Sequence, residues 1–126
     1  MTGITYLTTE DLLHLAQLLG VLDVRDVGLL DSAALRPQSV VYGTESYPML
    51  ADKGAAHIES IVGNHPLVDG NKRLGWAALV SFYALNGIFL ELEDDVAYEF
   101  VMGIAAGELR YLDIATQLAD WTQSPV

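Results

Sequence analysis

Apolar residues recur at helical spacing along most of the chain. Thr8 and Asp11 form a capping-box pattern, after which leucine and alanine repeat every three or four residues until Gly20. The pattern predicts a first helix over about Thr9–Leu19.

A short helix and an irregular segment are expected next. Asp31 is positioned to cap a helix through Leu35, because Pro37 disrupts its continuation. The stretch Ser39–Tyr47 combines consecutive apolar residues with a glycine, which favours an extended or irregular segment. This segment is either a plain connector or a flap that aligns a bound peptide.

Two long helices then flank a polar loop. Pro48–Gly63 has the mixed pattern of an amphipathic helix, and His65–Gly70 interrupts it. Asn71–Leu85 has almost no polar face, which is typical of a buried helix. Asn86 and Gly87, both tolerant of left-handed backbone, are expected to end it.

Two more helices complete the pattern. One opens at Glu93–Asp95, and the last spans Tyr111–Thr122. Because no repeat, low-complexity stretch or linker interrupts the chain, we expect a single domain over residues 1–126. The sequence predicts an all-α fold, a compact helical bundle around a buried central helix that follows the His65 loop.

Composition narrows the cellular setting. With 126 residues and 52% hydrophobic residues, the chain can bury a substantial core. It has no cysteine, which excludes disulfides and thiolate metal sites. Neither a secretory pattern nor an apolar run of roughly 20 residues occurs, so we expect a cytoplasmic protein without a membrane span.

The charge balance bears on partners. The formal net charge is −11, from 17 acidic and 6 basic residues. This charge opposes the phosphate neutralisation on which nucleic-acid affinity depends, so direct nucleic-acid binding, as by a small all-α DNA-binding protein, is disfavoured. The acidity favours a basic protein partner, but it equally serves solubility.

The segment from His65 to Arg73 gathers the chemically active residue types. Gly70 can bring backbone N–H groups close to an anion, and the helix that follows directs its positive dipole end to the same place. Asp69 supplies a hard oxygen ligand of the kind that suits Mg²⁺. Neither the P-loop nor the Rossmann glycine pattern occurs. The segment is interpreted as a phosphate site.

Two of the six cations, Lys72 and Arg73, stand together in the first turn of the expected buried helix. Cations at this end oppose the helix dipole by roughly 0.3–1 kcal/mol each, so an anionic ligand would explain them. The alternative is that Arg73 pairs with Asp69 and that Lys72 is merely solvated.

His65 is the candidate general base, because a histidine can be neutral at cellular pH and accept a hydroxyl proton. His14 and His57 have no acid, glycine or amide cluster beside them. Both are interpreted as ordinary helix residues.

The order His65-Pro66-Leu67-Val68-Asp69-Gly70-Asn71-Lys72-Arg73 resembles the Fic/Doc motif H-x-F-x-[DE]-[AG]-N-[GK]-R. It departs at Leu67, where the family usually has phenylalanine. Because that side chain normally packs inward, the change bears on packing more than on chemistry. The resemblance covers most of the chain.

The resemblance implies a role for each motif residue. His65 would be the general base toward a target hydroxyl, and Asp69 would coordinate Mg²⁺. The residues that would hold the phosphates of ATP, as anion cradle and cations, are Gly70, Asn71, Lys72 and Arg73.

Two positions point to one branch of the family. AMP-transferring relatives usually have glycine at the position of Lys72 and a second arginine at that of Trp76. The death-on-curing branch, which this chain resembles, phosphorylates a protein hydroxyl, elongation factor Tu being the known target. The resemblance therefore implies a toxin that acts as a Mg-ATP-dependent protein kinase on a translation factor. The alternatives are a Fic-type AMP-transferase and a catalytically silent binding module.

Toxins of this branch are paired with a small antitoxin whose C-terminal segment folds against the toxin. The inhibitory motif [ST]-x-x-x-E-[GN] is not apparent in this sequence, which agrees with inhibition by a separate protein. An apolar groove with acidic edges would suit such a segment.

Overall fold

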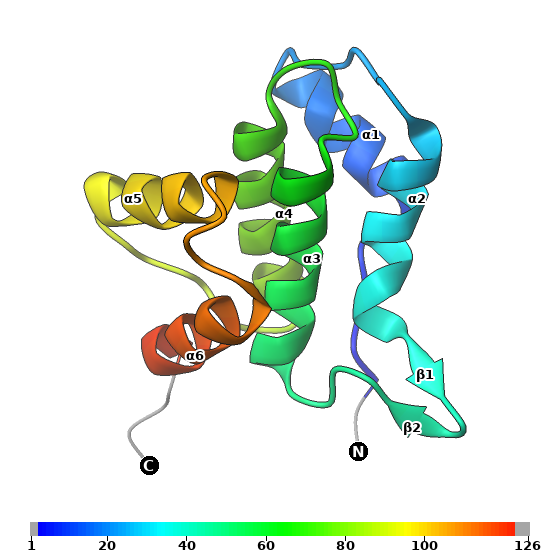
Figure 1. Ribbon diagram of the computed structural model, residues 1–126, viewed down its shortest axis with the longest axis vertical. Coiled ribbons are helices and arrows are strands. Elements are labelled where there is room, and N and C mark those ends of the chain that lie inside the picture. The colour runs from blue at the N-terminus through cyan, green and yellow to red at the C-terminus, as the bar shows by residue number, and fades with distance from the viewer. Residues whose placement is uncertain (1–2, 123–126) are drawn as a thin grey trace.

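The computed structural model describes residues 3–122. Six α-helices make up most of this part, joined by one small sheet (Figure 1). The predicted all-α fold is confirmed. The helices are α1 (Thr9–Leu18), α2 (Val27–Leu35), α3 (Leu50–Asn64), α4 (Asn71–Leu85), α5 (Asp94–Ala105) and α6 (Tyr111–Thr122). A turn of 3-10 helix, η1 (Arg36–Gln38), precedes a hairpin of β1 (Val40–Val41) and β2 (Thr44–Glu45).

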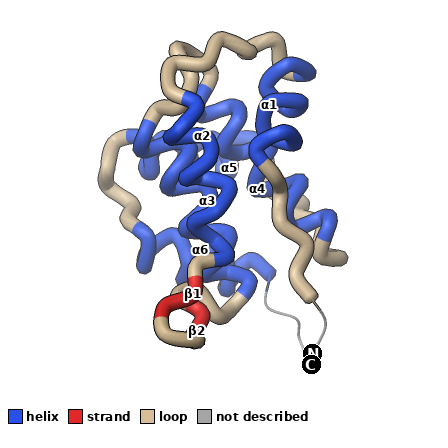
Figure 2. The backbone as a smooth tube through the Cα atoms, turned by 90° about the vertical axis from the view of Figure 1, so that its right-hand side faces the viewer, coloured by secondary structure: helices blue, strands red, loops and turns tan. Residues whose placement is uncertain are grey.

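Helix α3 lies at the centre of the bundle, where it packs against α2, η1, α4, α5 and α6 (Figures 1 and 2). Glycines permit this close packing. A Cβ on Gly54 would approach the Tyr83 ring to 3.0 Å and Leu79 to 3.1 Å. On α4, a Cβ on Gly75 would approach Val62 to 2.5 Å. The amphipathic pattern of this segment predicted a helix with one polar face. The glycines let neighbouring helices bury more of α3 than that pattern predicted.

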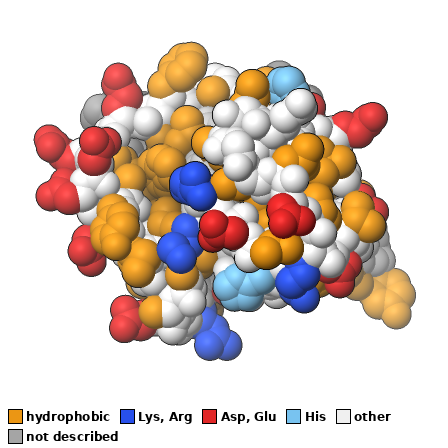
Figure 3. All heavy atoms as spheres, turned by 90° about the horizontal axis from the view of Figure 1, so that it is seen from above, with side chains coloured by type: hydrophobic (Ala, Val, Ile, Leu, Met, Phe, Trp, Pro, Cys, Tyr) orange, Lys and Arg blue, Asp and Glu red, His pale blue; other side chains and the backbone are white. Residues whose placement is uncertain are grey.

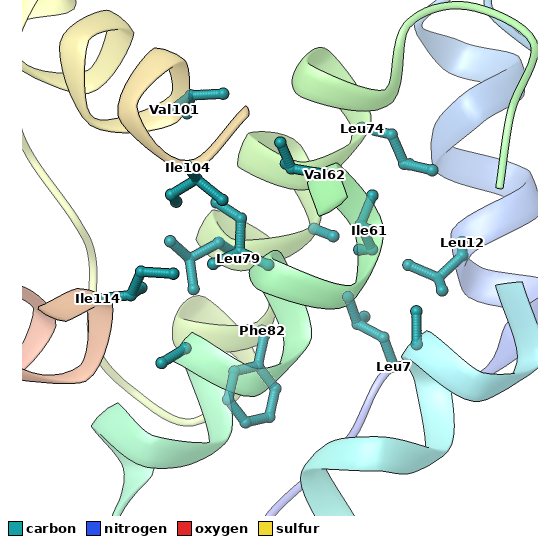
Figure 4. Packing of buried hydrophobic residues seen from close by; sticks show 14 of the residues in the cluster. Leu7, Leu12, Ile61, Val62, Leu74, Leu79, Phe82, Val101, Ile104 and Ile114 are labelled. Carbon is teal, nitrogen blue, oxygen red and sulfur yellow. The ribbon is translucent and has the colours of Figure 1, made fainter. Parts of the chain in front are cut away.

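The sequence predicted that α4 is buried all round as the central helix, but it is buried mainly along one face, Leu85 is exposed, and α3 occupies the centre. In the first turn of α4, Lys72 and Arg73 are exposed as well. Within residues 3–122, no helix is both long and apolar enough to cross a membrane. The core that joins the helices includes Leu7, Leu12, Ile61, Val62, Leu74, Leu79, Phe82, Val101, Ile104 and Ile114 (Figure 4).

The first helix begins as predicted. The Thr8 hydroxyl accepts a hydrogen bond from the Asp11 N–H, and the Asp11 carboxylate accepts one from the Thr8 N–H. The capping box is therefore confirmed. The helix ends at Leu18, and Leu19 is its C-cap.

The prediction for the start of the second helix was wrong. Helix α2 begins at Val27, because the Asp26 carboxylate accepts hydrogen bonds from two backbone N–H groups of the first turn. Asp31 lies inside the helix, where its carboxylate accepts a hydrogen bond from the Thr9 hydroxyl. Both aspartates precede apolar residues, so the pattern alone did not separate the cap from the interior position.

The end of α4 was predicted in part. Gly87 has left-handed backbone (φ 87°), whereas Asn86 does not (φ −107°). The Asn86 side chain instead forms two hydrogen bonds of 2.9 Å with the backbone of Thr5. These bonds fasten the N-terminal segment to the end of α4.

The hairpin lies at the N-terminal end of α3, whereas the His65 loop lies at its C-terminal end (Figure 1). Because α3 has 15 residues, roughly 22 Å separates its ends. The flap interpretation of this segment was therefore wrong. The hairpin is a connector fastened to α3, since the Lys53 ammonium lies 2.8 Å from the Glu45 carboxylate and also donates to the Tyr47 carbonyl.

Candidate active site

Left-handed backbone begins and ends the loop between α3 and α4. His65 (φ 54°) is the C-cap of α3, and Gly70 (φ 87°) is the N-cap of α4. Within the described residues, no side chain caps the first turn of α4. Because the first N–H groups of a helix have no intrahelical acceptors and carry the positive end of its dipole, this turn favours an anion.

The segment between α1 and α2 holds the loop in place. Val24 and Leu67 form an isolated antiparallel bridge. The Val68 N–H donates to the Asp23 carbonyl (2.8 Å), and the Arg25 N–H donates to the Pro66 carbonyl (2.8 Å). The loop is thus fixed by backbone hydrogen bonds to a distant part of the chain.

The Arg25 side chain closes the end of α3. Its Nε donates to the His65 carbonyl (2.7 Å), and its Nη2 donates to the Asn64 carbonyl (2.9 Å). These bonds satisfy two carbonyls that a helix C-terminus leaves without partners. No residue pattern marked Arg25 for this role, because the bonded residues lie 39 and 40 positions away.

Position 70 requires glycine. A Cβ at this position would come within 2.5 Å of Val21 Cγ1, and the backbone has positive φ. Side chains rarely adopt this conformation. Val21 therefore forms the wall against which the loop turns into α4.

Asn71 is 8% exposed and braces the loop with its side chain. Its Oδ1 accepts from the Leu67 N–H, and its Nδ2 donates to the Leu67 carbonyl, both at 2.9 Å. Only the backbone N–H of Asn71 is thus left to face an anion. Leu67 itself packs inward at 1% exposure, so the leucine fills the inward position of the motif.

All six candidate residues line one pocket of about 250 Å³. Its walls are His65, Val68, Asp69, Gly70, Asn71, Lys72, Arg73 and Ala105. We call it the loop pocket. Ala105, from the end of α5, is its one wall outside the motif, and residue chemistry gave no reason to assign it to the site.

The loop pocket is basic in an acidic protein. Within residues 3–122, Lys72 and Arg73 form no ion pair, since the ion pairs there are Arg36–Glu59 and Lys53–Glu45. The expected alternative, an Arg73–Asp69 pair, is therefore absent from this part of the chain. On the face that carries the loop, Lys and Arg side chains gather near the middle beside a histidine, and most acidic side chains lie toward the edges (Figure 3).

The other histidines lie outside the loop pocket. His14 is exposed on α1. His57 is 2% exposed within α3, and its Nδ1 lies 2.9 Å from the Ala33 carbonyl oxygen. Burial lowers the pKa of His57 to about 4. A neutral imidazole that donates from Nδ1 to this carbonyl fits a structural role.

Two larger cavities share wall residues with the loop pocket. The first, of about 430 Å³, shares Lys72 and Arg73 with it and is otherwise almost wholly apolar. We call it the apolar groove; its other walls are Leu19, Trp76, Ala77, Asp94, Ala97, Tyr98, Val101 and Met102.

The second cavity, of about 470 Å³, shares Ala105 with the loop pocket. We call it the polar groove. Its other walls are Arg36, Glu59, Ser60, Gly63, Asn64, Ile104, Ala106, Gly107, Leu109 and Arg110.

Comparison with known proteins agrees with this geometry. The chain matches a family model described as the Fic/DOC family over residues 6–83, a range that includes the whole loop and the segment that braces it. It is also 45% identical over 118 residues to a protein of Mycolicibacterium smegmatis named Toxin Doc, and the alignment covers 90% of this chain and 91% of that protein. The chain belongs to the Fic/Doc family.

Proposed function

We propose that the chain is the toxin of a toxin–antitoxin pair and that it acts in the cytoplasm as a Mg-ATP-dependent kinase of a translation factor resembling elongation factor Tu. One observation carries the proposal: His65 lines the same pocket as Gly70, Lys72 and Arg73. A candidate base and phosphate-binding groups thus face one space. The relative named Toxin Doc supports the toxin role.

The first turn of α4 supplies the phosphate contacts. The N–H groups of this turn, together with Lys72 and Arg73, would hold the oxygens of the transferred group and stabilise the charge that spreads over them. Holding these oxygens fixes the phosphorus close to His65. This positioning is the main contribution of a protein to phosphoryl transfer.

Asp69 is the residue that would hold Mg²⁺. Within residues 3–122, no group of three metal-ligating side chains occurs. A single exposed carboxylate at the loop pocket fits Mg²⁺, which commonly binds through one or two carboxylates together with substrate phosphates. When bound, the ion would screen the negative charge of those phosphates.

His65 would act on the acceptor hydroxyl. Its neutral imidazole takes the proton of a serine or threonine while the hydroxyl oxygen bonds to the γ-phosphorus of ATP. The bond from that phosphorus to the bridging oxygen breaks, and ADP leaves. The exposed position of His65 beside the pocket lets a protein segment reach it from solvent.

Lys72 and Trp76 support transfer of the γ-phosphate over transfer of AMP. Trp76 lines the apolar groove, and its ring lies edge-on to Phe100 with 6.2 Å between centroids. One guanidinium, that of Arg73, therefore serves this turn, where a second arginine would add a bidentate phosphate clamp.

The reaction can be tested with ATP labelled on either phosphate. In a lysate with Mg-ATP, the γ-label should transfer to protein and the α-label should not. His65→Ala should abolish transfer, whereas the matched control His14→Ala, an exposed histidine outside the pocket, should retain it. Transfer of the α-label would instead establish AMP transfer. An absence of transfer with either label would favour the silent binding module.

The apolar groove is the proposed site for an antitoxin segment. Its walls are apolar apart from Lys72, Arg73 and Asp94, so an amphipathic segment with acidic residues at one end would match it. Occupancy would cover Lys72 and Arg73 and thereby obstruct the loop pocket. The protein encoded by an adjacent gene is the expected occupant.

Growth assays can test this partner. Met102→Glu should keep the chain toxic but prevent neutralisation by the adjacent gene product, because it buries a charge in the groove. Leu112→Glu, at an exposed leucine of α6 outside the groove, is the control and should remain neutralised. Equal neutralisation of both variants would contradict the proposed site.

A further inference from the structure

The polar groove has no role in the proposed reaction, although it adjoins the loop pocket. The two cavities share Ala105, and Asn64, a wall of the polar groove, immediately precedes His65. The groove follows one side of α3 toward Arg36 and Arg110. A protein segment that lies in it and continues past Asn64 would reach His65.

The groove contains one cation without a matching carboxylate. The Arg36 guanidinium bonds to the Glu59 carboxylate at 2.9 Å and to the Tyr47 hydroxyl at 2.8 Å. Arg110 is exposed and, within residues 3–122, forms no ion pair. Its backbone N–H is bonded to Asp113, but its guanidinium is free to meet a ligand.

The walls of the groove suit a peptide better than a nucleotide. The C-terminal ends of α3 and α5 border it, through Gly63, Asn64 and Ala105–Gly107. Helix C-termini carry partial negative charge, which disfavours phosphate.

The polar groove is therefore the neighbouring cavity that suits the acceptor protein. If the phosphates lie at Lys72 and Arg73, the acceptor must approach His65 from the side of Ala105. This step rests on the proposed kinase function. The acceptor segment would then lie along the polar groove.

Helix geometry gives the distance from the groove to His65 along α3. Glu59 and Ser60, which bond to Arg36 and line the groove together with Arg110, precede His65 by five or six residues on α3, or about 8 Å along the axis. An extended peptide covers this length with about two or three residues. We propose that Arg110 is a specificity-determining residue that binds an acidic side chain about two or three residues from the hydroxyl that His65 activates.

Kinetics on the acceptor protein test the proposal. The protein labelled by γ-ATP would be purified and its labelled hydroxyl located by mass spectrometry. Arg110→Gln should raise the KM for this acceptor by about tenfold, the effect of losing one charged hydrogen bond. The kcat and the KM for ATP should not change. Thr116→Glu, which makes the same change in net charge at an exposed position of α6, should leave all three values unaltered.

A charge exchange completes the test. Arg110→Glu should lose the native acceptor, and replacing the acidic residue of the acceptor by lysine should restore it for this variant alone. Native kinetics in Arg110→Gln, or a labelled hydroxyl without an acidic residue within about four positions, would overturn the inference. If the native chain labels no protein, the proposed function itself fails and this inference fails with it. Labelling that is indifferent to Arg110 overturns the inference alone.

Discussion

The two ends of α3 use their cations in opposite ways. At the hairpin end, Lys53 contacts the Glu45 carboxylate, and farther along α3 Arg36 contacts the Glu59 carboxylate. At the loop end, Lys72 and Arg73 contact none within residues 3–122, although the chain has a net charge of −11. Lys53 and Arg36 hold the fold and are paired with carboxylates, whereas Lys72 and Arg73 are left for an anion from outside.

The largest expected effect comes from replacing one cation at each end of α3 by an uncharged residue. Arg73→Ala should lower the kcat/KM of phosphate transfer by about 10²–10³, as expected for a lost transition-state contact. It should not destabilise the protein, because an unfavourable charge leaves the helix N-terminus. Lys53→Met should do the reverse, lowering the free energy of unfolding by about 1–3 kcal/mol with transfer unchanged.

Transfer assays and urea unfolding on both variants provide the measurement. If Arg73→Ala destabilises the protein as much as Lys53→Met does, the proposed difference between the two ends is wrong, because Arg73 would then also hold the fold.

The histidines of α3 extend the comparison to pH. His65 is exposed at the loop end, whereas His57 is buried with a pKa lowered to about 4. The unfolded chain binds a proton at His57 near pH 6.5, and the folded chain binds it only near pH 4. The free energy of unfolding should therefore be highest above pH 6.5 and fall by up to ~3 kcal/mol as the pH drops toward 4.

Urea unfolding between pH 4 and 7.5 measures this effect. His57→Gln should lose most of the slope between pH 6.5 and 4, although it is less stable overall. His65→Ala should retain the slope. If the stability of His57→Gln depends on pH as strongly as that of the native chain, other groups cause the acid sensitivity.

Two glycines sharpen the contrast in packing. Gly70 at the loop and Gly43 at the hairpin both have positive φ (87° and 78°), but a Cβ would strike Val21 only at Gly70. Both alanine variants carry backbone strain, and Gly70→Ala adds a clash that should bring its cost to about 1–3 kcal/mol. It should also weaken ATP binding, which Gly43→Ala should not.

Thermal unfolding and calorimetric ATP titration compare the two variants. Adding Val21→Ala to Gly70→Ala should recover the part of the cost that is due to the clash. If the second substitution recovers neither stability nor ATP binding, Val21 is not the wall that fixes the loop.

The sequence predicted whatever was encoded locally. The motif from His65 to Arg73 is contiguous, so its residues had to lie near one another once a loop and a helix were expected. The helices were predicted because their apolar spacing is a local property. Asp31 was assigned the wrong role because a cap depends on backbone geometry, and Asp26 competes with it only five positions away.

What the sequence did not predict depends on contacts between distant segments. Val21 and Arg25 touch the loop from about 40–50 positions away, through a steric wall and hydrogen bonds to backbone carbonyls. Carbonyls are present in every residue, so no residue type marks such a partner. The flap interpretation failed for the same reason, since only the length and direction of α3 place the hairpin at the far end of the molecule.

The smallest expected effect concerns Arg25, which acts on the site through backbone alone. Its guanidinium donates to the His65 and Asn64 carbonyls at 2.7 and 2.9 Å, so Arg25→Gln should leave two carbonyls at the end of α3 without this partner. Both carbonyls lie near solvent and can bond to water, so the cost to stability should be only about 1 kcal/mol. His65, however, would lose the contact that holds its left-handed backbone. Transfer should therefore fall by about tenfold through kcat, because a displaced base is less well aligned with the hydroxyl. Hydrogen exchange should quicken at the loop and stay native at the hairpin, and Arg25→Lys, which can still donate to one carbonyl, should lie between the two. If Arg25→Gln shows native hydrogen exchange and native kcat, the backbone bonds from residues 23–26 are sufficient to hold the loop. The two ends of α3 would then differ in charge, but not in the way that a side chain holds them.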